Sequence, residues 1–163
     1  MALYEKFGEF DSAEELNKAA AGLEEEGDIE NLKELFKENG LDPEDVDDFM
    51  DGLAISELMA AVGKLNVESM ALGLPSSILI SDWEGYIRQL AAEDEDIAES
   101  VRRKNKSLAE CIAKIMEEAF KNQWTVPKEI IDKAKITASK VTFGIPSEAA
   151  VKKIIRDYYG GVE

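Results

Sequence analysis

Apolar residues recur at helical spacing, three or four residues apart, along almost all of this 163-residue chain. Such a stripe returns once per helical turn, so each segment that carries one can bury one face as an amphipathic helix. Typical helix starts stand before several stripes: Ser12 begins a capping box, Asp42 precedes a proline, and Ser107 precedes the most regular stripe. The pattern predicts a mostly α, multi-helix, bundle-like protein.

One stretch departs from helical spacing. Val141, Phe143 and Ile145 alternate with other residues, which is typical of a strand. We therefore expect at most one short β-strand or hairpin, near residues 140–146.

A second stretch is less clear. Residues 76–92 carry Ile80, Trp83 and Ile87 at helical spacing, which predicts a helix. A strand beginning at Ile78 is the alternative, and the later spacing favours the helix.

Charge is distributed unevenly along the chain, whose formal net charge is −16. Residues 1–99 contain 27 acidic and 6 basic side chains, whereas residues 100–163 contain 8 acidic and 13 basic ones. We predict an acidic helical N-terminal region over residues 1–94 and a mildly basic helical C-terminal region over residues 95–163.

Three acidic clusters stand out as candidate partner-binding residues. Duplex DNA carries one charge per about 1.7 Å of its axis, and a helix rises about 1.5 Å per residue. Dense carboxylates on helices therefore approach the charge density of nucleic acid, and they would attract a basic protein surface. The alternative is a solvated surface with acids at helix N-termini, where the helix dipole favours them. The candidates are Glu24, Glu25, Glu26 and Asp28, then Asp42, Glu44, Asp45, Asp47, Asp48 and Asp51, and finally Glu93, Asp94, Glu95 and Asp96.

The residues usually used in catalysis and metal binding are scarce. The chain has no histidine, and its single cysteine, Cys111, lies on an apolar helix face, where we predict an inert buried thiol. The acidic stretches lack the glycine and spacing of a calcium-binding loop, and no phosphate-binding glycine loop is present. We predict no catalytic residue, no metal and no cofactor, and we expect a protein that is not an enzyme.

The distribution of apolar and basic residues also gives an expectation for the cellular location of the protein. No apolar stretch approaches the roughly 20 residues that span a bilayer, and the N-terminus has no basic segment followed by an apolar run. We expect a cytoplasmic protein of a bacterial host cell that does not interact with membranes.

Two further features have competing interpretations. Trp83 falls on an apolar stripe and is predicted to be buried, and we favour a buried position for Trp124 as well, with an exposed interface anchor as its alternative. A basic run is either a linker, which we favour, or part of a helix-turn-helix-like nucleic-acid surface. The basic residues concerned are Arg102, Arg103, Lys104, Lys106, Lys114, Lys121, Lys128, Lys133 and Lys135.

The C-terminal region also resembles a known family. Residues 106–116, Lys-Ser-Leu-Ala-Glu-Cys-Ile-Ala-Lys-Ile-Met, resemble the Lys-Thr-Leu-x-x-Cys helix of PcfK-like proteins of conjugative plasmids and phages. The final segment from Val151 to Gly160, with Tyr158 and Tyr159, is similar to the terminal helix of that family. The resemblance covers roughly residues 95–160.

The resemblance implies a function, because the PcfK-like family includes anti-CRISPR proteins that inhibit the type II RNA-guided nuclease. That nuclease holds its heteroduplex in a positively charged channel. We therefore expect a non-enzymatic inhibitor that binds the guide-RNA-loaded effector through acidic residues and blocks DNA binding or cleavage. The alternative is a mobile-element accessory protein with a nucleic-acid-binding C-terminal helical module.

Overall fold

The computed structural model describes residues 3–74 and 79–161, and within them the chain is mostly helical, as predicted. The only strands described are two short ones that pair antiparallel. The elements in chain order are α1 (Ala13–Glu25), α2 (Ile29–Glu38), the 3-10 helix η1 (Pro43–Asp45), α3 (Val46–Met50), α4 (Glu57–Leu72), α5 (Leu79–Glu93), α6 (Glu95–Arg102), α7 (Leu108–Lys121), β1 (Trp124–Thr125), α8 (Lys128–Lys133), β2 (Thr142–Phe143) and α9 (Glu148–Tyr159).

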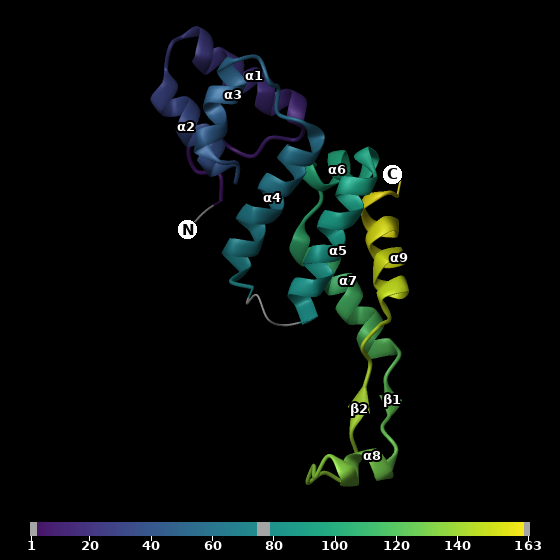
Figure 1. The fold of residues 1–163 in the computed structure, drawn as a ribbon. Helices are drawn as coiled ribbons and strands as arrows, with labels where there is room; N and C mark the ends of the chain where they lie inside the picture. The colour runs from purple at the N-terminus through teal and green to yellow at the C-terminus, as the bar shows by residue number, and fades with distance from the viewer. Residues whose placement is uncertain (1–2, 75–78, 162–163) are drawn as a thin grey trace.

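Three parts can be distinguished in Figure 1. The N-terminal lobe, residues 11–56, holds α1, α2, η1 and α3. The bundle consists of α4, α5, α6, α7 and α9. The arm, residues 122–146, leaves the bundle at the end of α7, carries α8 at its tip, and returns to the start of α9.

Serine caps begin several of these helices. The side chains of Ser12, Ser107 and Ser147 each accept a hydrogen bond from the backbone N–H three residues further on. Each bond satisfies one of the backbone donors that a helix N-terminus leaves unpaired. The helix starts predicted at Ser12 and Ser107 are therefore confirmed.

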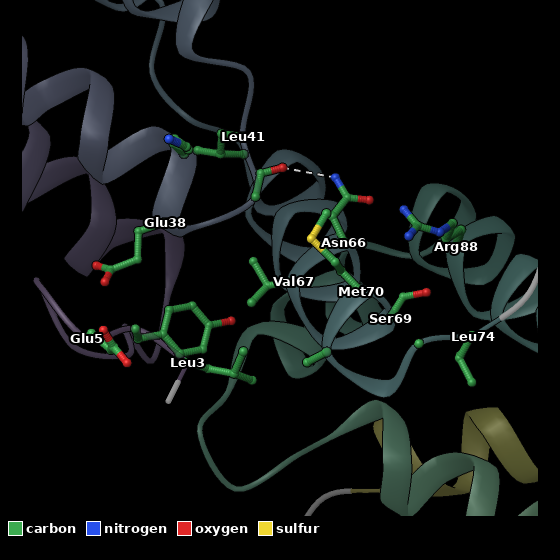
Figure 2. A pocket seen from close by; sticks show the side chains of 15 residues that line it. Leu3, Glu5, Glu38, Leu41, Asn66, Val67, Ser69, Met70, Leu74 and Arg88 are labelled. Carbon is green, nitrogen blue, oxygen red and sulfur yellow. Dashed lines mark hydrogen bonds between the residues drawn. The ribbon is translucent and has the colours of Figure 1, made fainter. Parts of the chain in front are cut away.

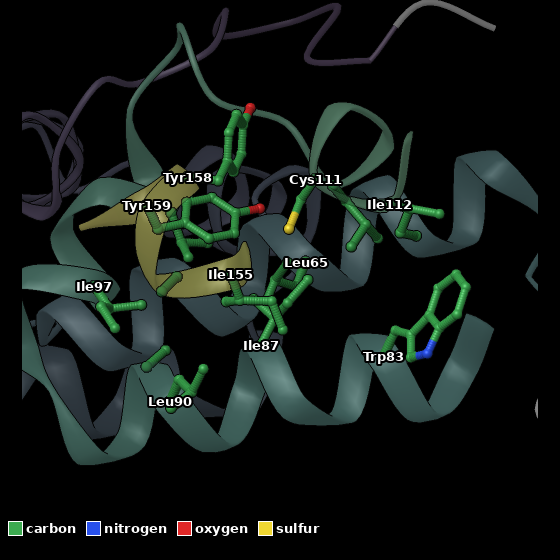
Figure 3. Close-up of a cluster of buried hydrophobic side chains, with 14 of the residues drawn as sticks. Leu65, Trp83, Ile87, Leu90, Ile97, Cys111, Ile112, Ile155, Tyr158 and Tyr159 are labelled. Atoms are coloured by element: carbon green, nitrogen blue, oxygen red, sulfur yellow. The ribbon is translucent and has the colours of Figure 1, made fainter. Parts of the chain in front are cut away.

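The lobe and the bundle have separate apolar clusters. In the lobe, Leu16, Leu32 and Leu35 are buried, and the rings of Phe36 and Phe49 meet edge to face with centroids 5.9 Å apart. The bundle cluster, drawn in Figure 3, contains residues from all five helices of the bundle. They include Leu65, Ile87, Ile97, Cys111, Ile155 and Tyr159.

The division between the two clusters falls inside α4, where Ala60 belongs to the lobe cluster and Ala61 to the bundle cluster. This boundary between the two cores lies well before the change from acidic to basic composition near residue 99. The division of the chain into residues 1–94 and 95–163 was predicted from charge, and it stays a prediction.

Close backbone packing joins the lobe to the bundle. A methyl group added to Gly63 in α4 would collide with the carbonyl oxygen of Asn39, at the end of α2. Only a residue without a side chain allows this approach. Gly63 is therefore required by the contact between the lobe and the bundle.

The structure also settles the two uncertain stretches. Helix α5 begins at Leu79, so helical spacing is confirmed from there, while residues 75–78 lie outside the described part of the chain. Near residues 140–146 the predicted strand is present as β2, which pairs with β1 so that Trp124 faces Phe143. Among the described helices, none is both long and apolar enough to cross a membrane.

Candidate functional site

The first acidic cluster lies at the turn between α1 and α2. Glu25 and Glu26 are exposed, and Glu24 is half-buried. Asp28 caps α2, because one carboxylate oxygen accepts from the backbone N–H of Asn31 at 3.1 Å and the other from its side-chain amide at 2.7 Å. These hydrogen bonds, the backbone one foremost, lower the pKa of the Asp28 carboxyl.

The second cluster covers η1 and α3. Asp42 caps η1 by accepting from the backbone N–H of Glu44 at 2.9 Å. Asp47, Asp48 and Asp51 are exposed and form no hydrogen bond or ion pair through their carboxylates within the described residues. In this cluster, the Asp42 carboxylate caps a helix, whereas the carboxylates of Asp47, Asp48 and Asp51 make no polar contact within the described residues.

The third cluster lies at the junction of α5 and α6. Asp94 caps α6 through the backbone N–H of Asp96, at 3.0 Å. The cluster lies close to the start of α4: burial, together with the carboxylates of Glu99 and Glu95, raises the pKa of Glu57. Negative potential therefore extends across the boundary between the bundle and the lobe.

The fourteen predicted acidic residues share two properties. None is buried, eleven of them being exposed and three half-buried. Eight other acidic side chains form ion pairs, whereas these fourteen form none within residues 3–74 and 79–161. The capping interpretation is confirmed for Asp28, Asp42 and Asp94. Partner binding by these clusters stays a prediction.

A groove of about 1220 Å³ lies beside the acidic lobe (Figure 2). It is lined by the N-terminal segment, by the end of α2 and by α4, with the exposed side chain of Met70 reaching solvent. Asn66 donates to the carbonyl of Gly40 at 2.9 Å along one wall. The sequence did not indicate this groove, because its walls come from segments far apart in the chain.

Two polar side chains of the groove, Ser69 and Arg88, are both bound by Glu84. Ser69 donates to one carboxylate oxygen of Glu84 at 2.9 Å, and Arg88 binds the other at 2.6 Å.

Within the described residues, no group of three or more histidine, cysteine, aspartate and glutamate side chains is arranged to hold a metal ion. Burial raises the pKa of the Cys111 thiol to about 12, so the thiolate is rare at neutral pH.

The basic run at the end of α6 includes one side chain that is used inside the protein and one that forms an exposed ion pair. Arg102 is fully buried, and its guanidinium donates to the side-chain oxygen of Asn39 at 2.7 Å. Arg103 pairs with Glu99 at 3.1 Å. A helix-turn-helix requires two helices packed together, but α8, which follows α7 in the chain, lies at the tip of the arm (Figure 1). These residues do not form a helix-turn-helix surface.

A buried lysine is the polar centre of the junction. The ammonium of Lys64 on α4 pairs with Glu9 at 2.9 Å and donates to the carbonyls of Arg103 and Lys106, at 2.6 and 2.9 Å. It ties the N-terminal segment to the α6–α7 connection. Nothing in the sequence around Lys64 distinguishes it from a solvent-facing lysine, so this role was not predicted.

The two tryptophans differ in environment. Trp83 is 5% exposed, which confirms its predicted burial. Trp124 is 53% exposed, so the favoured prediction of a buried position was wrong. The reason is that β1 belongs to the arm, where no second layer covers it.

Comparisons with protein-family models, with curated proteins and with solved structures found no match for this chain. The resemblance to PcfK-like proteins therefore stays a prediction that depends on residues 95–160 alone.

Proposed function

We propose that this protein is a non-enzymatic inhibitor of a type II CRISPR effector nuclease. It binds the guide-RNA-loaded enzyme at a basic, nucleic-acid-handling surface and blocks target DNA binding or cleavage. The observation that carries the proposal is that fourteen carboxylates reach solvent without a cationic partner among the described residues. Unpaired charge of one sign is available for a partner of the opposite sign.

The distribution of charge supports the choice of surface. Residues 11–57 carry 17 acidic and 3 basic side chains. Most of these acids stand on helices, and the helices of the lobe are held by a core of their own. A rigid scaffold of this kind presents charge without the entropy loss of ordering a flexible segment. The C-terminal resemblance narrows the partner to the type II effector, whose channel is positively charged.

The decisive experiment is a DNA cleavage assay with purified effector, guide and target, in the presence and absence of this protein. We expect loss of cleavage, co-elution of the two proteins, and weaker co-elution as salt increases. The variant Asp47→Asn/Asp48→Asn/Asp51→Asn removes three exposed carboxylates that make no described contact, so it should lower inhibition while the fold persists.

A matched control separates local from total charge. The variant Glu117→Gln/Glu118→Gln/Glu129→Gln changes the net charge by the same amount in the C-terminal half. We expect it to inhibit like the unaltered protein. An equal loss of inhibition in both variants would show that only net charge matters. If neither variant loses inhibition, the second acidic cluster is not part of the interface.

A further inference from the structure

The arm exposes most of its large apolar side chains. Trp124 is 53% exposed, Phe143 48% and Ile145 57%, and Ile130 and Ile136 also reach solvent. Only Val126 and Ile131 are buried among its large apolar residues. Large apolar side chains gathered and exposed on one short segment make it a candidate interaction site.

Two aromatic rings lie side by side on this surface. Trp124 and Phe143 are directly opposite each other across the antiparallel pair of β1 and β2, and therefore share one face of the hairpin. Their ring centroids are 6.5 Å apart, with 38° between the ring planes. Rings held next to each other and open to solvent can each receive the face of a base.

The arm is held in a definite position. The backbone N–H of Val126 donates to the carbonyl of Val141 at 2.9 Å, and Thr142 donates to the side chain of Gln123 at 3.1 Å. At the base of the arm, a methyl group on Gly144 would collide with the carbonyl of Ala119 in α7. Hydrogen bonds between the two strands and close packing against α7 therefore hold the aromatic pair in a fixed position outside the bundle.

The charge of the arm is opposite to that of the lobe. It carries two acids, Glu129 and Asp132, and four lysines, Lys128, Lys133, Lys135 and Lys140. All four lysines are exposed, and none forms an ion pair or hydrogen bond through its side chain within the described residues. By contrast, Lys18, Lys64, Lys121, Lys152 and Lys153 all lie within ion-pair distance of a carboxylate.

The acidic lobe does not cancel this local charge. Figure 1 shows the arm leading away from the lobe, on the far side of the bundle. Helix α7 has 14 residues at a rise of about 1.5 Å each, so about 21 Å of helix separates the start of the arm from the α6–α7 connection. The Debye length at physiological salt is about 8 Å. An anion near the arm therefore experiences its lysines more than the distant carboxylates.

We propose that the arm binds single-stranded nucleic acid, with bases stacked on Trp124 and Phe143 and lysines contacting the phosphates. Aromatic rings reach base faces only when the bases are unstacked, which favours a single strand over a duplex. Four lysines are also few for a duplex-binding protein, which makes 6 to 10 phosphate contacts in well-characterised cases, as an order of magnitude. This proposal is independent of the inhibitor function, because it uses a different surface.

The test uses the full chain and fluorescently labelled 12-nucleotide single strands, oligo(dT) and oligo(U), with binding measured by anisotropy. We expect binding of one or both strands at 50 mM salt, and weaker binding of a duplex of equal length. Intrinsic tryptophan fluorescence should be quenched on binding, because Trp124 is exposed while Trp83 is buried and shielded from the ligand.

Variants distinguish stacking from general apolar contact. Trp124→Ala should weaken binding by about 5- to 150-fold, which corresponds to the loss of one base–aromatic stack. Phe143→Leu keeps the apolar volume but should still weaken binding, whereas Ile136→Ala should not. Equal losses for Ile136→Ala and Trp124→Ala would overturn base stacking and indicate an apolar protein partner.

The salt dependence tests the lysines. Each phosphate contact on a single strand contributes a slope of about −0.7 in log affinity against log salt, so four contacts predict a loss of roughly 50-fold between 50 and 200 mM salt. Lys128→Gln/Lys140→Gln should make this slope shallower by about 1.4. Absence of both quenching and binding at 50 mM salt would overturn the proposal. The Asp47/Asp48/Asp51 variant should bind the strands at least as well as the unaltered chain, so the two proposals fail separately.

Discussion

The N-terminal lobe and the arm combine charge and apolar surface in opposite ways. Among the described residues, the lobe buries Leu16, Leu32 and Phe36 and leaves all its carboxylates except that of Glu14 without an ion pair, whereas the arm leaves Trp124 and Phe143 exposed and its lysines unpaired. A segment with its own core keeps its shape and can devote its surface to charge. A segment without a core relies on the bundle for its position and offers apolar side chains directly to a partner.

The comparison implies that the stability of the protein depends on the junction of lobe and bundle far more than on the arm. The largest effect is expected at Lys64, whose ammonium is enclosed by Glu9 and two backbone carbonyls. Lys64→Met leaves these acceptors unpaired, and removal of one member of a buried charged pair costs about 3–5 kcal/mol of unfolding free energy. Urea denaturation monitored by circular dichroism measures this loss.

Trp124→Ala is the matched measurement in the arm. Because the side chain is half exposed and its ring lies 6.5 Å from that of Phe143, centroid to centroid, we expect its effect on the unfolding free energy to be within about 1 kcal/mol. If the two substitutions destabilise the protein equally, the arm is part of the cooperative core and the comparison with the lobe fails.

An intermediate effect is expected at Gly63, where α4 meets the end of α2. Gly63→Ala places a methyl group against the carbonyl of Asn39 and should lower the unfolding free energy by about 1–3 kcal/mol, the usual range for overpacking. Gly85→Ala is the control, since no atom lies within 4 Å of the added methyl group in the middle of α5. That change should stabilise the helix by about 0.5–1 kcal/mol. An increase in the unfolding free energy for both variants would show that the lobe does not need this close approach.

The smallest effect concerns Glu57, where the lobe meets the third acidic cluster. Burial and the neighbouring carboxylates of Glu99 and Glu95 raise its pKa in the folded protein. The folded state therefore holds this proton to higher pH than the unfolded state, and the stability present below about pH 4 decreases as pH rises through the folded pKa. Glu57→Gln removes that loss. Thermal unfolding at pH 7 should therefore show that the variant is more stable than the unaltered protein by less than about 1 kcal/mol, whereas at pH values under about 4 the two should be equally stable.

Glu14→Gln serves as the control for this pH dependence. A hydrogen bond from Lys18 lowers the pKa of the fully exposed Glu14 carboxyl, so its substitution should bring no gain at pH 7. An equal gain in both variants would mean that general relief of negative charge, and not the local arrangement at Glu57, accounts for the effect.

The amino-acid sequence by itself determined the helices and their starting points. Ser12, Asp28 and Ser107 cap helices because a short polar side chain can reach the free N–H groups of the first turn, which is a local property. The exposure of the acidic clusters was also predictable, since unpaired carboxylates are rarely buried.

Only the tertiary structure decided which polar residues are buried and which apolar ones are not. Lys64 and Arg102 look like surface residues in the sequence, yet α2, α4 and the α6–α7 connection close around them. Trp124 looks like a core residue, yet the chain leaves the bundle before reaching it. Burial depends on which distant segments cover a residue, and local spacing contains no information about them.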